Sequence, residues 1–305
     1  MTSRDKPSDK PTDKPADRHA ANQADRHEER QARLVEIYDD EILPAYAARF
    51  AAMASRALEI RPGLRAVEVG CTTGHLTRTL AERLGPDGHL TALDGSAAFV
   101  AKARARIEAD GTAHSPVALL ARPGIPRTLP LDDHAAERVV SSLAIAGAAD
   151  PAAAVMEAAR VLAPGGQLVV TAPLRGTWSE FFDLFRDVLR EGRKHVSLGA
   201  LDRHIATLPD GPAVAAWLTR AGLTQVTITV ERWEILFKSA REFFFAPLIE
   251  LGPLARWKEL SGRGDEMQDV FFFTKEAIDV YFKGRPFAVT VVGAAVSGWK
   301  PIGSQ

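Results

Sequence analysis

Residues 65–74 read Arg-Ala-Val-Glu-Val-Gly-Cys-Thr-Thr-Gly, and they are the part of the chain best suited to hold a ligand. An apolar strand pattern runs into a turn bounded by Gly70 and Gly74, and a helical pattern begins at His75. Backbone N–H groups at the start of such a helix attract the polar end of a ligand. The arrangement predicts a site for a nucleotide-like cofactor.

Two common versions of this turn do not fit. A dinucleotide site requires Gly-x-Gly-x-x-Gly, but counting from Gly70 places Thr72 and His75 at the other two glycine positions. A P-loop requires Gly-Lys-Ser/Thr after the turn, and that sequence does not follow here. A nicotinamide-dependent oxidoreductase is therefore only a distant alternative.

The turn resembles motif I of class I S-adenosylmethionine (SAM)-dependent methyltransferases, in particular the type 11/25-like group, with the pattern apolar-Asp/Glu-apolar-Gly-x-Gly-x-Gly. Glu68, Gly70 and Gly74 match this pattern, and Thr72 replaces the middle glycine. Further segments resemble later motifs of the same family in the same order. They are Leu-Asp-Gly-Ser at 93–96, Leu-Pro-Leu-Asp-Asp at 129–133 and Arg-Val-Leu-Ala-Pro-Gly-Gly at 160–166.

The resemblance implies SAM as the cofactor. It implies that Asp94 binds the ribose hydroxyls, that Glu68 orients the turn or the SAM ammonium, and that Tyr38 lies against SAM. The complete set of cofactor-binding residues expected in this way is Tyr38, Glu68, Gly70, Cys71, Thr72, Gly74, Asp94, Gly95, Ser142 and Leu143. Asp94 could instead be an N-cap-region acid, and Cys71 a packed small residue. No catalytic residue and no metal ligand is assigned.

The chain departs from the family pattern at several positions. Thr72 is β-branched and should keep an ordinary φ. Ala121-Arg122 stand where the family has Gly-Asp for adenine, and Ala146-Gly147 stand where many relatives have histidines. Two functions follow: SAM-dependent methyl transfer to an unidentified small-molecule acceptor by in-line, proximity-driven reaction, or a catalytically degenerate methyltransferase-like protein that acts as a binding or assembly partner.

The elements that must position these residues alternate between strands and helices. Expected strands cover 66–69, 89–93, 117–120, 138–143 and 167–171, with helices over about 74–84, 96–109 and 151–162 between them. Later strand patterns follow at 225–237 and 287–296. We expect an α/β fold with a doubly wound, mostly parallel seven-stranded sheet, Rossmann-like, with helical lid insertions.

The chain has 305 residues, a net charge of −1 and one cysteine. Residues 1–30 contain three copies of Asp-Lys-Pro-x, at 5–16, and are expected to form a disordered, charged tail. Residues 31–305 should be one methyltransferase-like domain, with a core at about 62–175 and aromatic lid or acceptor segments at about 31–60, 176–208 and 238–284. A helix over 31–60 should break near Pro44.

Composition and patterning limit the partners and the compartment. The single cysteine and the lack of a signal-peptide pattern lead us to expect a cytoplasmic protein. We expect no nucleic-acid or membrane partner. The aromatic segments could form an ordinary lid core, an apolar acceptor pocket or a homodimer interface.

Overall fold

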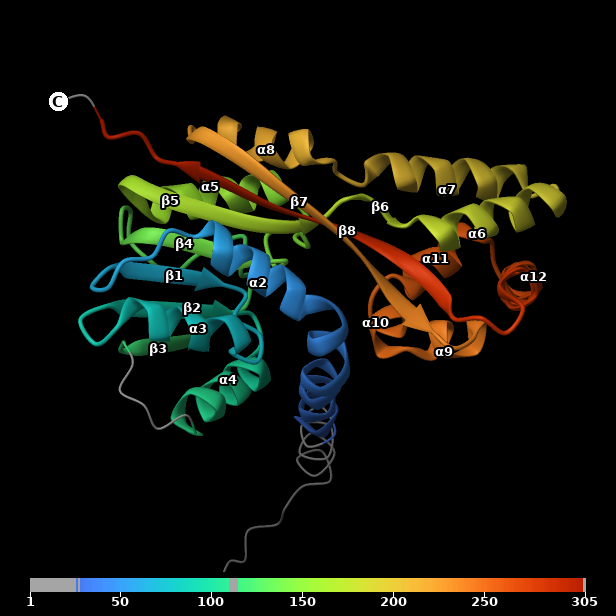
Figure 1. The fold of residues 1–305 in the computed structure, drawn as a ribbon, viewed down its shortest axis with the longest axis horizontal. Helices are drawn as coiled ribbons and strands as arrows, with labels where there is room; N and C mark the ends of the chain where they lie inside the picture. The colour runs from blue at the N-terminus through green and yellow to red at the C-terminus, as the bar shows by residue number, and fades with distance from the viewer. Residues whose placement is uncertain (1–25, 27, 110–114, 304–305) are drawn as a thin grey trace, which may run out of the picture.

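The computed structural model describes residues 26, 28–109 and 115–303. The expected tail at 1–30 lies almost entirely outside the described residues. A seven-stranded sheet of order β3-β2-β1-β4-β5-β8-β7 crosses the molecule (Figure 1). Strands β1 to β5 are parallel, and β8 is antiparallel to both of its neighbours. The strands are β1 Arg65–Val69, β2 His89–Asp94, β3 Val117–Ala121, β4 Ala136–Ser142, β5 Leu162–Pro173, β6 Arg175–Trp178, β7 Thr224–Phe237 and β8 Phe287–Trp299.

Helices cover both faces of this sheet, as the alternating sequence pattern predicts. They are η1 Tyr38–Ala47, α2 Ala48–Ala57, α3 His75–Leu84, α4 Ala97–Ala109, α5 Pro151–Val161, α6 Ser179–Glu191, α7 His195–Thr207, α8 Gly211–Arg220, α9 Ala240–Phe245, α10 Pro247–Glu250, α11 Leu254–Leu260 and α12 Asp265–Phe282. The expected helices and strands of the core are confirmed to within a few residues, although β5 is much longer than the segment 167–171. The sheet is doubly wound.

Successive residues of a strand point to opposite faces, which divides the core in two. Val67 and Val139 pack with α5 and α8, whereas their neighbours Ala66 and Val140 pack with α2 and α3. Both sets are almost completely buried. We call this part, built on β1–β5 with α2–α5 and α8, the sheet lobe.

Strands β7 and β8 continue beyond the sheet. β8 pairs with β5 only from Gly293 to Trp299, but its pairing with β7 extends to Phe287 opposite Phe237. The projecting ribbon reaches a group of helices at the right of Figure 1. There it joins a second buried cluster that includes Phe181, Phe243 and Trp257. We call the ribbon with α6, α7 and α9–α12 the aromatic lobe.

The N-terminal helical segment corrects one expectation. The helix does not break near Pro44: it is continuous from residue 28 to Ala57, and Pro44 lies inside the π-helical stretch η1. The backbone N–H of Ala48 accordingly bonds to the carbonyl of Leu43, five residues back. Proline lacks an N–H and its ring collides with the carbonyl four residues earlier, and the wider π turn accommodates both defects.

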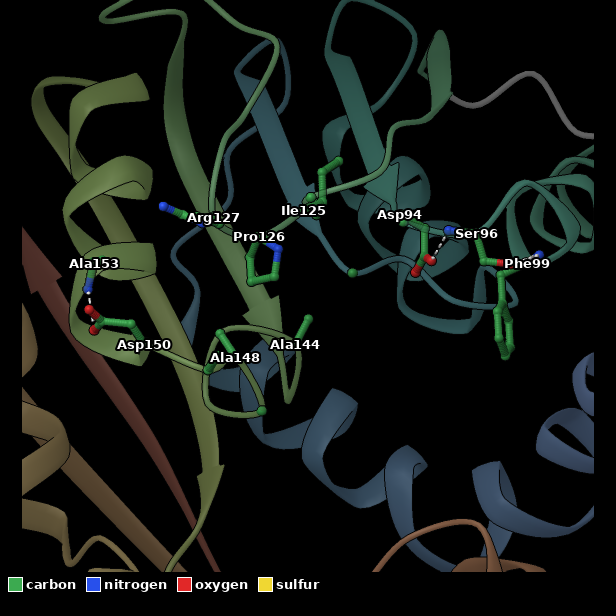
Figure 2. Close-up of a pocket in the computed structure, with 15 residues that line it drawn as sticks. Asp94, Ser96, Phe99, Ile125, Pro126, Arg127, Ala144, Ala148, Asp150 and Ala153 are labelled. Carbon is green, nitrogen blue, oxygen red and sulfur yellow. Dashed lines mark hydrogen bonds between the residues drawn. The ribbon is translucent and has the colours of Figure 1, made fainter.

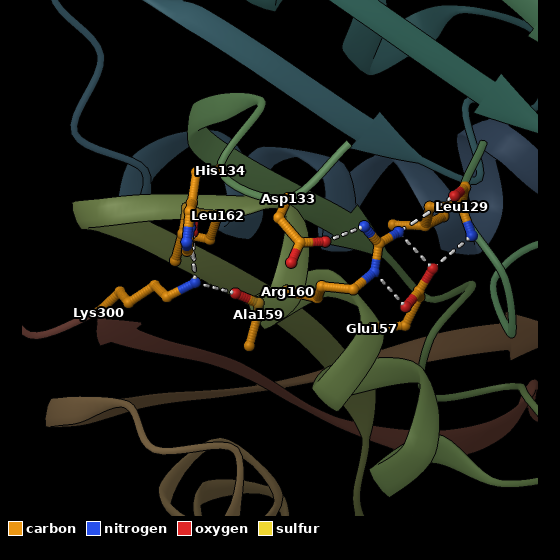
Figure 3. A network of polar contacts seen from close by, with 8 residues as sticks. All are labelled: Leu129, Asp133, His134, Glu157, Ala159, Arg160, Leu162 and Lys300. Carbon is orange, nitrogen blue, oxygen red and sulfur yellow. Dashed lines mark hydrogen bonds and ion pairs between the residues drawn. The ribbon is translucent and has the colours of Figure 1, made fainter. Parts of the chain in front are cut away.

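Two of the four family-like segments are joined by a polar network (Figure 3). Arg160 bonds to Glu157 at 2.8 Å and to Asp133 at 2.7 Å, and it also donates to the carbonyl of Leu129. Lys300, just after β8, donates to the carbonyl of Leu162 at 2.7 Å. These contacts fix the segments that lead into β4 and β5, so both motifs act here as structural elements.

Candidate functional site

The turn after β1 adopts a left-handed backbone at three alternate positions. Gly70, Thr72 and Gly74 have φ of 84°, 46° and 80°. A Cβ on Gly70 would overlap the Cβ of Ala144, and one on Gly74 would lie 2.9 Å from Cα of Ala103. Both glycines are therefore required by conformation and by close approach.

The expectation for Thr72 is wrong: its φ is positive. The turn keeps the left-handed geometry that a glycine would adopt, although the β-branched side chain disfavours it. A hydrogen bond of 3.0 Å from the Thr72 N–H to Oδ2 of Asp94 helps to hold this conformation. Threonine therefore replaces the middle glycine of the family pattern, while the backbone of the turn keeps its left-handed conformation.

Asp94 ends β2 beside this turn and is 9% exposed. Its Oδ2 accepts from Thr72 N and its Oδ1 accepts from Ser96 N at 2.9 Å. The N–H groups of Gly70 and Cys71 both donate to the carbonyl of Leu93, which draws the two strand ends together. Asp94 thus accepts hydrogen bonds from the backbone of the turn, as an acid in an N-cap region would, and it also presents its carboxylate at the carboxyl ends of β1 and β2.

A cavity of about 740 Å³ opens at these strand ends (Figure 2). One wall holds Asp94, Ser96 and Phe99; the opposite wall comes from the loop after β3 and from the region between β4 and α5. The lining residues are Gly70, Asp94, Gly95, Ser96, Phe99, Gly124, Ile125, Pro126, Arg127, Ala144, Gly147, Ala148, Ala149, Asp150 and Ala153. Its size lies within the range of small-molecule sites.

Three of the ten expected cofactor residues line this cavity: Gly70, Asp94 and Gly95. Thr72 and Gly74 shape the turn behind it. Ser142 ends β4 and Leu143 follows it, just before Ala144; Leu143 N donates to Thr171 Oγ1 at 3.2 Å. Cys71 is 1% exposed within a small apolar cluster, as the packed-residue alternative predicts. Direct cofactor contacts by the residues outside the lining stay predictions.

Glu68 lies under the turn and is 1% exposed. Thr77 Oγ1, on α3, donates to its Oε2 at 2.6 Å. Burial raises the pKa of Glu68 to about 7; the bond from Thr77 opposes this rise, and the negative charge of Asp94 adds to it. The side chain links β1 to α3, so it supports the turn from below.

The corner expected for adenine is built differently from the family pattern. Arg122 is exposed, and its side chain donates to the carbonyl of Ala121 at 3.2 Å. Its backbone N–H donates to the carbonyl of Asp94 at 2.9 Å. The cavity wall is formed instead by Gly124–Arg127, a longer loop whose lining role sequence reasoning did not identify.

Other lining residues were also missed. Phe99 lies one turn into α4, and Ala144 and Ala148 form a floor of small side chains after β4. Asp150 is the N-cap of α5, where its side chain accepts from Ala153 N at 3.0 Å, and it also lines the cavity. No pattern in the sequence marks these positions, because their place depends on how separate loops meet.

Most aromatic residues of the expected lid segments are buried or partly buried, and many of them pack against one another. Phe181 stacks on Trp257 with ring centroids 4.2 Å apart, and Tyr46 stacks on Trp178 at 6.1 Å. Of the three alternatives expected for these segments, the structure therefore mainly shows an ordinary packed lid core. The aromatic side chains that remain exposed in these segments are Phe245, Phe272, Phe273 and Tyr281.

Within residues 26, 28–109 and 115–303, no cluster of His, Cys, Asp or Glu is arranged to hold a metal ion. Over the same residues, no helix combines the length and the apolar character needed to cross a bilayer.

Comparison with known proteins agrees with this geometry. Residues 67–170 match the model of a methyltransferase domain family, a match that spans β1 to β5. This part of the chain belongs to the methyltransferase domain family. The methyltransferase domain thus includes Glu68, the Gly70–Gly74 turn and Asp94, and Phe99 and the cavity loops also lie within its limits.

Relatives match over about half of the chain. A 37.1 kDa protein in transposon TN4556 of Streptomyces fradiae, described as uncharacterized, is 36% identical over 45% of this chain, and the match covers 38% of that protein. Demethylmenaquinone methyltransferase of Bacillus cytotoxicus is 26% identical, covering 57% of this chain and 75% of the relative. A malonyl-[acyl-carrier protein] O-methyltransferase of Alcanivorax borkumensis is 32% identical, covering 48% and 46%.

Solved structures support the fold of the methyltransferase domain. The crystal structure of the YcgJ protein of Bacillus subtilis aligns with a TM-score of 0.51 at 15% identity, covering 84% of this chain and all of that one. At this identity the likeness concerns the fold alone, which is the expected Rossmann-like arrangement.

Proposed function

We propose that this chain is a SAM-dependent methyltransferase whose cofactor lies across the carboxyl ends of β1, β2 and β4. The observation that carries the proposal is the Asp94 carboxylate, fixed by Thr72 N and Ser96 N at the wall of the 740 Å³ cavity. A carboxylate so placed accepts charge-assisted hydrogen bonds from paired hydroxyls, as on a ribose. The Gly70 turn beside it provides close backbone approach.

SAM, when bound, supplies a methyl group activated by its sulfonium. The chain then has to align an acceptor nucleophile in line with the methyl–sulfur bond and to exclude water, which is chiefly a problem of proximity. A general base is required only if the acceptor must lose its proton early. The small side chains after β4, among them Ala144 and Ala148, leave space at the cavity and supply no titratable group.

We further propose that residues 31–305 act as one unit, with the aromatic lobe and η1 on the acceptor side. Relatives that are named for methylating a menaquinone precursor or a malonyl thioester indicate a small or carrier-bound acceptor. We favour a small-molecule acceptor. Homodimer formation through the exposed aromatic residues remains a prediction.

Calorimetric titration with SAM tests the proposal directly. We expect binding by the wild type and a loss of about 10- to 100-fold in affinity for Asp94→Asn, since hydrogen bonds to charged groups contribute about 1.5–3 kcal/mol. Asp133→Asn is the matched control, because Asp133 bonds to Arg160 in the network that leads into β4, away from the cavity lining. Absence of wild-type binding at high SAM concentration, or equal affinity for Asp94→Asn, contradicts the proposal.

The second candidate is a degenerate methyltransferase that binds without transferring. The observation that favours it is Arg122, which stands in place of the family's adenine-binding acid and whose side chain donates to the carbonyl of Ala121. Release of S-adenosylhomocysteine is the discriminating measurement, with a demethylated naphthoquinone and a malonyl thioester as trial acceptors. Turnover on either one excludes the degenerate form, and SAM binding without turnover on any acceptor supports it.

A further inference from the structure

Asp39 is a carboxylate outside the cavity lining that contacts three side chains from two other elements. It lies on η1 with its side chain 10% exposed. Its Oδ1 accepts from Thr73 Oγ1 at 2.7 Å, and Nη2 of Arg106 bonds to both carboxylate oxygens at 2.7 and 2.8 Å. The ammonium of Lys102 lies 3.6 Å away. Burial alone would raise the pKa of Asp39, but the hydrogen bonds from Thr73 and Arg106 outweigh it and hold the pKa below its usual range.

These partners belong to two elements that border the candidate site, the turn after β1 and helix α4. Thr73 is fully buried inside the turn between Thr72 and Gly74. Arg106 and Lys102 project from α4, the helix that also carries Phe99 into the cavity wall. Arg106 donates to Thr73 as well, at 3.1 Å, so that one carboxylate, one guanidinium and one hydroxyl form a closed set. We call Asp39, Thr73 and Arg106 the latch.

The residue next to Asp39 makes a parallel contact. The ring of Tyr38 meets the ring of Phe99 edge-on, with centroids 5.3 Å apart. Tyr38 is near enough to the Thr72 side chain for a hydrogen bond to influence its pKa, although burial is the larger effect and raises that pKa. Two consecutive residues of η1 therefore hold the turn and α4 at the same time.

Positive charge exceeds negative charge around the latch. A hollow of about 430 Å³ beside it is lined by Arg78, Lys102 and Arg106 with Asp39. The pKa of His75, at the start of α3, is lowered first by burial and then by the charges of Arg106 and Arg78. Removing the Asp39 charge therefore removes the anion through which η1 attracts Arg106 and Lys102, both on α4, and this loosens η1 from that helix.

We propose that Asp39 is a positioning residue, and that the latch couples the docking of η1 to the shape of the cavity. Closed, it holds the Thr72–Thr73 turn and Phe99 at the separation seen in the structure. When the latch opens, the turn and α4 are released and cofactor binding weakens. The affinity part of this inference rests on the proposed SAM site, whereas the coupling part concerns the chain alone.

The test compares Asp39→Asn with Glu137→Gln. The control removes the charge of another well-formed ion pair, Arg65–Glu137 at 2.6 Å, at the amino end of β4 and away from the cavity. SAM affinity is measured by calorimetry and amide hydrogen exchange by mass spectrometry over 38–47, 70–74 and 97–109. For Asp39→Asn we expect affinity about tenfold lower and faster exchange in all three segments. For Glu137→Gln we expect neither change.

A charge reversal sharpens the test. Asp39→Lys with Arg106→Glu should recover part of the affinity that either single change removes, as expected for residues that interact directly. Lys102→Gln removes only the cation at 3.6 Å and, should Asp39→Asn fail to fold, reports the same direction with an effect of about two- to threefold.

Three outcomes overturn the inference. The first is unchanged SAM affinity in Asp39→Asn. The second is faster exchange confined to 38–47, which would show that η1 moves without the turn or α4. The third is an equal loss in Glu137→Gln, which would indicate general destabilisation. If the wild type binds no SAM, the proposed function fails by itself, and the exchange pattern over 70–74 and 97–109 still decides whether the latch couples these segments.

Discussion

Strand β8 pairs with β5 of the sheet lobe and continues into the aromatic lobe, but the two lobes fill their interiors in different ways. The sheet lobe packs small aliphatic side chains on both faces of a parallel sheet and leaves a cavity at the strand ends. The aromatic lobe packs large rings on one another around the projecting ribbon. A parallel sheet therefore creates a binding edge as a consequence of its topology, whereas stacked rings create rigidity.

The same contrast separates residues that form the ligand site from residues that stabilise the fold. In the sheet lobe, backbone conformation at Gly70 and Thr72 and hydrogen bonds from Asp94 determine the site. In the aromatic lobe, the buried area of the rings determines stability. Substitutions should consequently affect ligand affinity in the first lobe and unfolding in the second.

The largest expected effect is in the aromatic lobe. Trp257 is completely buried and contacts the rings of Phe181, Phe182 and Phe243. Trp257→Ala should lower the free energy of unfolding by about 3–5 kcal/mol, because it removes a large buried side chain and leaves a void. Urea unfolding followed by circular dichroism measures the loss, and SAM affinity of the folded protein should change little.

Phe273→Ala is the control for Trp257→Ala. Phe273 lies on α12 in the same lobe but is 57% exposed, so the expected change is within about 0.5 kcal/mol. Equal losses for the two variants, or a large loss of SAM affinity in Trp257→Ala, would show that the lobes do not divide stability and binding in this way.

The next effect compares two glycines of nearly equal conformation. Gly63 and Gly70 have φ of 85° and 84°, but a Cβ at Gly63 meets nothing within 4 Å, whereas one at Gly70 overlaps Ala144. Gly63→Ala should cost about 1 kcal/mol from backbone strain alone. Gly70→Ala should cost about 2–4 kcal/mol, since overpacking is added to strain, and it should also weaken SAM binding.

Thermal unfolding and SAM titration of both glycine variants provide the measurement. The difference between them isolates the clash, because the strain is common to both. Similar stability losses, with SAM binding intact in Gly70→Ala, would mean that Ala144 can move aside and that the close approach at this turn has no role in the site.

Much of the sheet lobe could be predicted from sequence because its signals are local. Apolar strands, Gly and Pro turns and the Asp150 cap are each contained within a few residues, and four motifs in register specify the family fold. The roles of the four motifs were harder to predict from the sequence. The segments at 129–133 and 160–166 help to hold the fold together through Arg160, while only the two earlier motifs reach the cavity.

The remainder depends on contacts between distant segments. Thr72 keeps a positive φ although threonine disfavours it, and the Asp94 carboxylate, 22 residues later, accepts a bond from its N–H. Phe99 reaches the cavity through the orientation of α4, and Asp39 meets Arg106 across 67 residues. Neither spacing nor periodicity in the sequence predicts contacts between such distant residues. The sequence therefore predicted the position of the turn correctly but the sign of φ at Thr72 wrongly.

The smallest effect expected here is a pH dependence that belongs to the sheet lobe. Burial raises the pKa of Glu68 from 4.5 to about 7, so the folded state retains a proton that the unfolded chain has lost in this range. The contribution to stability is complete below 4.5, decreases as pH rises toward about 7 and is constant above it. Glu68→Gln stays neutral throughout while its amide oxygen can still accept from Thr77. The stability of this variant relative to wild type should therefore increase with pH across the window, by about 1–3 kcal/mol.

Urea unfolding of both proteins at several pH values between about 4.5 and 8 gives this difference, and histidine titration, common to both, cancels from it. Phe273→Ala in the aromatic lobe should show a difference from wild type that does not vary with pH, because it changes no titratable group. A Glu68→Gln difference that is likewise flat would mean that Glu68 is ionised in the folded protein at all these pH values. The turn would then rest on a buried carboxylate, and Glu68 would contribute no pH dependence to stability between about 4.5 and 8.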